Sequence, residues 1–247
     1  MTVAVNDIIS RAQSTLQDNT AVRWLSAELV NFINDAQREI ALLKPDASAA
    51  NTTLQLNGGT KQTIPSDGNR LLRVVRNMDG TSASSPGGRA VRLVQREVLD
   101  SQSPTWHDAN DAATSGSDAA HGTIVKHYIY DEQNPRNFYV YPGITGTEGS
   151  SASAYLEIIY SKNPAAVSAG GNISIPDIFA NAILDYTLFR AYTKDAEFAG
   201  NATRANTHYN LFINSVTGKG RIDVVTSPNA VSNAAAAGAP LPSQMTG

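Results

Sequence analysis

The sequence predicts an α+β protein in which two pairs of helices flank a β region. Apolar residues repeat at helical spacing near the start of the chain and again from Pro176, whereas apolar and polar residues alternate in between. Neither helical pair makes a good core alone. We therefore expect the N- and C-terminal helices to pack as a four-helix bundle, with an antiparallel β-sandwich or barrel-like domain inserted between them.

The first two helices are predicted from apolar stripes that end at clear stop signals. The second helix should begin with Ser26 as its N-cap, carry Glu28 where the helix dipole favours an acid, and stop at Pro45. Spacings of three and four place the apolar residues of the first helix on one face: Val5, Ile8, Ile9, Ala12 and Leu16.

The β region begins near residue 51, where the repeat of apolar residues changes from helical spacing to every second residue. Gly58-Gly59 lies between the alternating runs 53–56 and 61–64, which predicts a hairpin. No helix is expected in this region, so short strands favour a sandwich or barrel. The further strands are predicted over residues 71–76, 90–94, 123–130, 137–141 and 154–160, with Gly- and Ser-rich loops at 79–88 and 108–122.

Helical spacing returns at Pro176, a favoured first helical position, and Asp195 is predicted to cap a further helix. Apolar residues at steps of three and four predict that this further helix packs on its neighbours along one side, which we call its seam. The seam consists of Phe198, Ala202, Ala205, Tyr209, Phe212 and Val216.

After Gly218 the chain contains no aromatic residue, and alone this tail should be disordered. It nevertheless carries sparse apolar anchors that are suited to folding on a partner protein or a neighbouring subunit. Ile222, Val224 and Val225 alternate like a short strand, and Leu241 stands between two prolines in an extended element. The predicted domains are therefore the N-terminal helices (1–50), the β domain (51–170), the C-terminal helices (171–217) and a flexible tail (218–247).

Composition excludes several classes of protein. The chain has no cysteine, which excludes disulfides and thiolate metal sites. A net charge of -3 gives it no general attraction for nucleic acid. Neither a signal peptide nor a run of about 20 apolar residues is found, so we expect synthesis in the cytoplasm of the cell that makes the protein and no membrane partner.

Catalytic signatures are missing from the sequence, so the prediction is a non-enzymatic protein without a cofactor or metal. The four histidines lack metal-ligand spacing. The adjacent pair Trp106-His107 has two interpretations. It could stack on a sugar or a base, but the favoured interpretation is a buried anchor for the long loop that follows. Gly218-Lys219-Gly220 is better explained as a helix end than as a phosphate loop.

Six arginines cluster in two predicted strands, and three interpretations stay open: a basic strip for DNA phosphates, contacts to a neighbouring subunit, or a solvated strand face. The cluster consists of Arg70, Arg73, Arg76, Arg89, Arg92 and Arg96. For the subunit interface, the predicted residues are Arg73, Arg76, Arg92 and Arg96.

Several segments, taken in order over about residues 20–217, resemble phage head-to-tail adaptor proteins. They are Trp24, Leu29, 34–40 (Asn-Asp-Ala-Gln-Arg-Glu-Ile), Pro45-Asp46, 60–65 (Thr-Lys-Gln-Thr-Ile-Pro), 71–74 (Leu-Leu-Arg-Val), Trp106-His107, 134–142 (Asn-Pro-Arg-Asn-Phe-Tyr-Val-Tyr-Pro), 160–164 (Tyr-Ser-Lys-Asn-Pro), 175–177 (Ile-Pro-Asp), Asp185-Tyr186 and 190–195 (Arg-Ala-Tyr-Thr-Lys-Asp). The family is similar to the tail tubular protein A class of short-tailed phages.

This resemblance implies a homo-oligomeric ring of about twelve copies at the head-tail junction of a virion. It also implies a portal protein above the ring, a lower tail protein (nozzle or tube) beneath it, and non-specific DNA in the lumen. The alternative function is a carbohydrate- or receptor-binding β module of a tail spike or fibre. Such a module needs exposed aromatics, for which the sequence offers Tyr128, Tyr130, Tyr139 and Tyr141.

Overall fold

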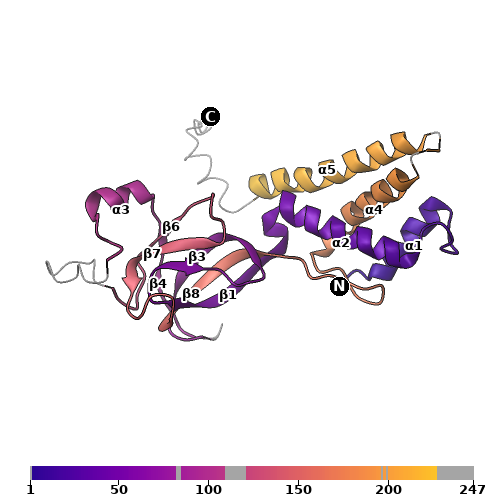
Figure 1. Ribbon diagram of the computed structural model, residues 1–247. Coiled ribbons are helices and arrows are strands. Elements are labelled where there is room, and N and C mark those ends of the chain that lie inside the picture. Colours follow the sequence, from indigo (N-terminus) through magenta and orange to yellow (C-terminus); the bar gives the residue numbers. More distant parts are fainter. Residues whose placement is uncertain (1, 82–84, 109–120, 196, 199, 227–247) are drawn as a thin grey trace, which may run out of the picture. The chain divides into compact units, whose positions relative to one another are not determined.

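The computed structural model describes residues 2–81, 85–108, 121–195, 197–198 and 200–226 (Figure 1). The chain divides into two units. The helical unit comprises Met1–Lys44 and Ala165–Gly247, and the β unit comprises Pro45–Pro164. Most helices belong to the first unit and all described strands to the second, which confirms the predicted α+β class.

The helical unit consists of α1 (Val5–Leu16), α2 (Ser26–Leu43), the short 3-10 helix η3 (Asp177–Phe179), α4 (Ala180–Lys194) and α5 (Asn201–Thr226). Helix α4 contacts α1, α2 and α5, so helices from both ends of the chain share one core. The five apolar residues predicted for the inner face of α1 are all buried. Among the largest fully buried side chains here are Ile8, Leu29, Ile33, Ile40, Phe179 and Phe212.

Three helix starts differ from the prediction. Ser26 is the first residue of α2 and not its N-cap, and its hydroxyl accepts a hydrogen bond from Gln13 Nε2 at 3.4 Å. Helix α4 begins at Ala180 because one turn of 3-10 helix follows Pro176. Asp195 ends α4 instead of capping α5, since its carboxylate pairs with a side chain from the other helical pair.

The predicted strand at Ile222–Val225 is wrong, because α5 continues without a break to Thr226. Extending an existing helix adds one hydrogen bond per residue, and this offsets the roughly 1 kcal/mol that each of Gly218 and Gly220 costs in a helix interior. A seam over Ala205, Phe212 and Val216 is buried as predicted, whereas Phe198 lies before the helix and is 62% exposed. Leu241 lies outside the described residues.

The β unit begins with the 3-10 turn η1 (Pro45–Ser48) and contains two four-stranded sheets. The first has the order β1-β8-β3-β4 and the second β2-β7-β6-β5. Within the described residues the sheets remain separate and no closed barrel forms. The strands are β1 (Ala49–Asn57), β2 (Gly59–Thr63), β3 (Gly68–Met78), β4 (Gly87–Ala90), β5 (Arg92–Leu93), β6 (His127–Tyr130), β7 (Asn137–Ile144) and β8 (Ser151–Lys162).

Pairing within the sheets is antiparallel except between β5 and β6, which run parallel. The inner faces of the sheets form the main core, which includes Leu56, Phe138, Leu156 and Ile158. A second cluster lies on the outer face of the β2-β7-β6-β5 sheet, where Leu99 and Trp106 pack on Ile129. Leu99 belongs to α3 (Arg96–Gln102), a helix that the sequence pattern did not predict.

The expected hairpin at Gly58-Gly59 is also wrong, because β1 and β2 belong to different sheets. The chain turns a corner here. Gly59 has a φ of +93°, and a Cβ at Gly58 would lie 2.5 Å from the carbonyl oxygen of Thr147. The two glycines therefore allow the chain to cross closely over the β7–β8 turn, a role that the alternating pattern on either side does not reveal.

Candidate functional site

The four predicted interface arginines lie on three elements, β3, β5 and α3. Arg76 on β3 is paired with Glu157 of β8 at 2.6 Å, and its guanidinium covers Gly87. Arg96 on α3 is paired with Asp100 at 3.3 Å. Arg73 and Arg92 are exposed on β3 and β5 and form no ion pair within the described residues. Two of the four therefore have partners inside the chain already.

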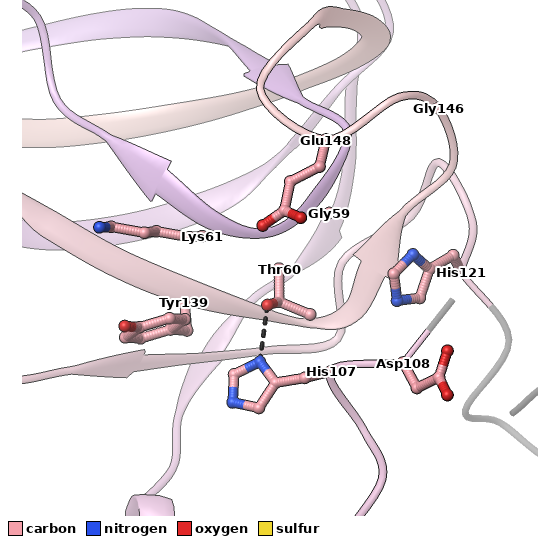
Figure 2. A pocket seen from close by; sticks show the side chains of 9 residues that line it. All are labelled: Gly59, Thr60, Lys61, His107, Asp108, His121, Tyr139, Gly146 and Glu148. Atoms are coloured by element: carbon pink, nitrogen blue, oxygen red, sulfur yellow. Dashed lines mark hydrogen bonds between the residues drawn. The ribbon is translucent and has the colours of Figure 1, made fainter. Parts of the chain in front are cut away.

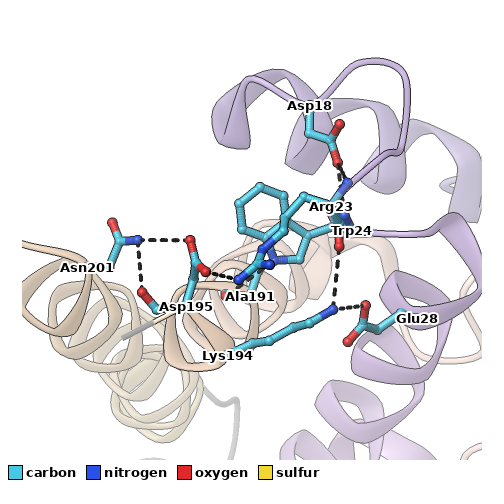
Figure 3. Close-up of polar contacts among 8 residues, drawn as sticks. All are labelled: Asp18, Arg23, Trp24, Glu28, Ala191, Lys194, Asp195 and Asn201. Atoms are coloured by element: carbon cyan, nitrogen blue, oxygen red, sulfur yellow. Dashed lines mark hydrogen bonds and ion pairs between the residues drawn. The ribbon is translucent and has the colours of Figure 1, made fainter. Parts of the chain in front are cut away.

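One end of the helical unit is held by an unusually dense set of polar contacts (Figure 3). The Asp18 carboxylate accepts hydrogen bonds from three consecutive backbone N–H groups, those of Val22 at 2.9 Å and of Arg23 and Trp24 at 2.8 Å each. The flanking residues Gln17 and Ala21 both have positive φ, 57° and 53°. Left-handed backbone costs energy in non-glycine residues, so the surroundings must impose this loop conformation.

The loop is fastened to the other helical pair by two side chains (Figure 3). Trp24 is 8% exposed, and its indole N–H donates to the Ala191 carbonyl of α4 at 3.3 Å. Arg23 pairs with Asp195, which is itself largely buried. Lys194 adds an ion pair to Glu28 of α2 at 2.6 Å. Together these contacts join the α1–α2 loop to the end of α4.

The same loop presents apolar side chains to solvent. Val22 is 80% exposed and Leu25 is 60% exposed, while Phe198 stands exposed just beyond Asp195. Exposed apolar groups on a rigid frame are typical of protein–protein contacts. We name Val22, Leu25 and Phe198 the tip surface.

Asp18 should make the stability of the tip depend on pH. The backbone N–H groups of Trp24, Val22 and Arg23 hold the pKa of this carboxyl below its ordinary value, against the opposing effect of burial. A folded-state pKa below the unfolded one gives stability that is present above about pH 4 and is lost as pH falls through the folded-state pKa. Asp18→Asn should therefore lower the unfolding free energy at pH 7 and flatten its fall in acid.

Urea unfolding followed by helical circular dichroism at neutral and acidic pH measures this effect. Glu197→Gln is a suitable control, because Glu197 is an exposed acid near the same end of the helical unit. If the two variants have the same pH profile, Asp18 does not hold the loop.

Two residues of the quoted resemblance, Asn34 and Gln37, fasten the chain segment that leads into η3. Asn34 exchanges hydrogen bonds with the backbone of Val167 at 2.8 and 3.1 Å. Gln37 is 1% exposed, and its carbonyl oxygen accepts from both the N–H and the hydroxyl of Ser174. These residues therefore act in folding, and their side chains are not available to a partner.

A polar pocket of about 580 Å³ opens in the β unit (Figure 2). Its walls include His107, His121, Lys61, Tyr139 and Glu148. The remaining lining residues are Gly59, Thr60, Asp108 and Gly146.

A hydrogen bond joins two walls of this pocket. His107 Nδ1 and the Thr60 hydroxyl are 2.7 Å apart, and burial, followed by Arg96, lowers the pKa of His107. A hydroxyl bonded to an imidazole is the pairing of a nucleophile with a base. However, Thr60 is only 7% exposed, so this bond connects β2 to the segment after α3 instead of presenting an open nucleophile.

Trp106 has the anchoring position that the sequence favoured. It is 1% exposed, its indole N–H donates to Asp100 at 2.9 Å, and its ring stacks on His107. Most of the loop that follows, residues 109–120, lies outside the described residues. A ring that is buried in this way cannot stack on a sugar or a base.

The four tyrosines proposed for a sugar-binding face are not an exposed platform either. Tyr128 and Tyr130 face the main core, whereas Tyr139 and Tyr141 pack against the α3 cluster. The period-two alternation thus reflects two packed faces of one sheet. Within the described ranges, no group of three His, Cys, Asp or Glu side chains could hold a metal ion.

Comparison with known proteins assigns the chain to a family. Among the residues that the structure describes, no helix combines the length and apolar character needed to cross a bilayer. No curated protein matches the sequence significantly. The profile of the SU10 adaptor protein family matches residues 3–232, a range that includes all the helices and strands that the structure describes. The chain therefore belongs to the SU10 adaptor protein family and is a structural adaptor protein of a phage virion.

Proposed function

We propose that this protein is a non-enzymatic subunit of a ring that joins the phage portal to the tail and surrounds the DNA passage at the head-tail junction. The observation that carries the proposal is the family match over residues 3–232, because it covers the helical unit and the β unit together. The resemblance to the tail tubular protein A class supports a ring of about twelve copies, a portal above it and a nozzle or tube protein below it.

A ring of identical subunits needs two different complementary surfaces on each copy. The tip surface is suited to one of them, because Val22 and Leu25 project from a loop that its own hydrogen bonds hold in place. In this proposal the four helices act as a bundle that forms the body of the ring. Arg73 and Arg92 lack ion pairs within the described residues, and they are better suited to a neighbour's carboxylates than Arg76 and Arg96.

The C-terminal part of the chain is the proposed contact with the portal or an adjacent subunit. The segment with Ile222, Val224 and Val225 belongs to α5, so a contact through this part of the chain would be made by a helix and not by an added strand. Leu241 would follow in an extended segment.

The test is electron microscopy of the purified protein alone and mixed with the portal protein of the same phage. We expect rings that dock on the portal. Val22→Asp should weaken this assembly by about tenfold or more, because a charge would replace an apolar contact that becomes buried between subunits of the ring. Leu42→Asp on α2 is the matched control, because Leu42 is 73% exposed in the same unit.

Both variants should unfold at the same temperature as the parent protein, because neither side chain contributes to the core. A chain that remains monomeric beside its portal would contradict the proposed function. Equal losses in the two variants would contradict only the role of the tip surface.

A further inference from the structure

A small cleft opens between the two sheets of the β unit, beside the early part of β3. Strand β4 pairs with β3 only at Arg76 and Met78, and the chain then crosses to β5 in the other sheet. Over its earlier residues β3 therefore has β8 on one side and no strand on the other, within the ranges that the structure describes. The cleft has a volume of about 230 Å³, and we name it the edge cleft.

The walls of the edge cleft are mainly apolar. They include Leu71 of β3, Leu93 of β5, and Tyr128 and Tyr130 of β6. Leu93 is 61% exposed although it belongs to a strand. Sites for small molecules typically have volumes of about 300–1,000 Å³. A cleft below that range is better suited to one or two side chains of another protein chain.

Arg70 gives the edge cleft a cation that no described carboxylate neutralises. Its side chain is half-buried, and its Nε is enclosed without a hydrogen-bond partner. Glu132 also lines the cleft, but it is exposed and forms no ion pair with Arg70. A guanidinium that is partly withdrawn from water loses solvation, which a carboxylate from outside the chain would replace with charge-assisted hydrogen bonds.

Arg73 adds a second positive charge beside the edge cleft. It is exposed on β3 and forms no ion pair within the described residues. Burial raises the pKa of Tyr128, whereas a backbone hydrogen bond at Val74 and then the charge of Arg73 lower it. Arg73 therefore acts on a residue of the cleft wall. An apolar cleft with two unpaired arginines is suited to a projecting apolar group that carries an acid.

The tip surface of the helical unit has this matching chemistry. Val22, Leu25 and Phe198 expose three apolar side chains, and Glu197 is an exposed acid directly before Phe198 in the chain. Glu197 forms no ion pair with any described residue. An apolar group that fits a pocket elsewhere on the next copy makes a head-to-tail contact, and such contacts form a ring when the rotation between copies closes.

We propose that the tip surface of one copy of this chain inserts into the edge cleft of the next copy, with the Glu197 carboxylate bonded to Arg70. Phe198 would then cover the apolar wall that includes Leu93. The inference rests on the proposed ring and deepens it, because it names both complementary surfaces of each subunit. It also places Arg73, one of the arginines predicted for a subunit interface, beside the contact.

The experiment exchanges the two charges and measures the concentration at which the full-length protein forms rings, alone and with the portal protein of the same phage, by mass photometry. Arg70→Glu and Glu197→Arg should each weaken ring formation by about 10- to 100-fold, the effect of losing a charge-assisted hydrogen bond. The double variant Arg70→Glu/Glu197→Arg should recover most of this loss, because it restores the pair with reversed polarity.

Arg136→Glu/Glu197→Arg is the mismatched control, since Arg136 is exposed in the same unit and does not line the edge cleft. This control should not recover. Arg70→Met keeps the apolar stem of the side chain and should weaken ring formation without placing an acid in the cleft, so a folding defect of Arg70→Glu does not decide the result.

Equal ring formation by the matched and the mismatched double variants would overturn the proposal. So would a loss of portal docking in the Arg70 variants alone, which would assign the cleft to the portal. Normal portal-docked rings in every variant would overturn this interface and leave the proposed function intact. Recovery in the matched variant without any docking on the portal would support the interface while contradicting the proposed function.

Discussion

Replacing Trp24 with alanine is expected to lower the unfolding free energy of the helical unit by about 3–5 kcal/mol, the range for truncating a buried aromatic side chain. Trp24 is 8% exposed, and its indole N–H is bonded to the Ala191 carbonyl. Its backbone N–H is one of the three that bind the Asp18 carboxylate. The substitution therefore opens a cavity and loosens the loop that presents the tip surface.

Urea unfolding followed by helical circular dichroism measures this loss. Trp24→Phe should be milder, because it keeps most of the apolar contact and removes only the indole hydrogen bond. Val22→Ala changes an 80% exposed neighbour in the same loop and should stay within about 0.5 kcal/mol of the parent. An effect of Trp24→Ala as small as that of Val22→Ala would show that Trp24 does not fasten the α1–α2 loop to α4.

Asn77→Ala is expected to destabilise the β unit by about 3–5 kcal/mol, since each buried polar group left unpaired costs about 1–3 kcal/mol. The alanine would leave the N–H of Val125 and the carbonyls of Arg89 and Val125 without their partner. Asn77→Asp should be at least as harmful. It preserves the shape but places a carboxylate against two carbonyl oxygens.

Denaturant unfolding monitored by signals from the β unit checks this prediction, with Asn69→Ala as the control because Asn69 is exposed on the same strand. Unchanged stability of Asn77→Ala would mean that water satisfies these polar groups.

The helical faces and the change of period were predictable because burial follows the local repeat of the chain. An inward-facing residue on a helix must recur at steps of three and four, and on a strand at steps of two, whatever it packs against. Val5, Ile8 and Ala12 are buried for this reason. The strand runs around residues 71–76 and 154–160 were placed correctly on the same basis.

Sheet membership and polar partners could not be read from the sequence. Gly58-Gly59 has the local pattern of a hairpin, but only the close approach of the Thr147 carbonyl shows why β2 must leave β1 for the other sheet. Likewise Asp195 resembles a helix cap until Arg23, 172 positions away in the chain, is placed beside it. Pairings over such separations depend on how whole elements pack.

The residues with a possible functional role also divide into those that the sequence predicts and those that only the fold brings together. The sequence by itself determined the class of protein, through ordered segments such as Trp24 and the stretch from Asn34 to Gln37, which the structure shows to be folding contacts. Only the tertiary structure decided which arginines are neutralised. Arg76 and Arg92 look alike in the chain, but β8 brings Glu157 to Arg76, while β6 brings His127 to Arg92. Charge compensation is a property of neighbours in space, and strand order sets those neighbours.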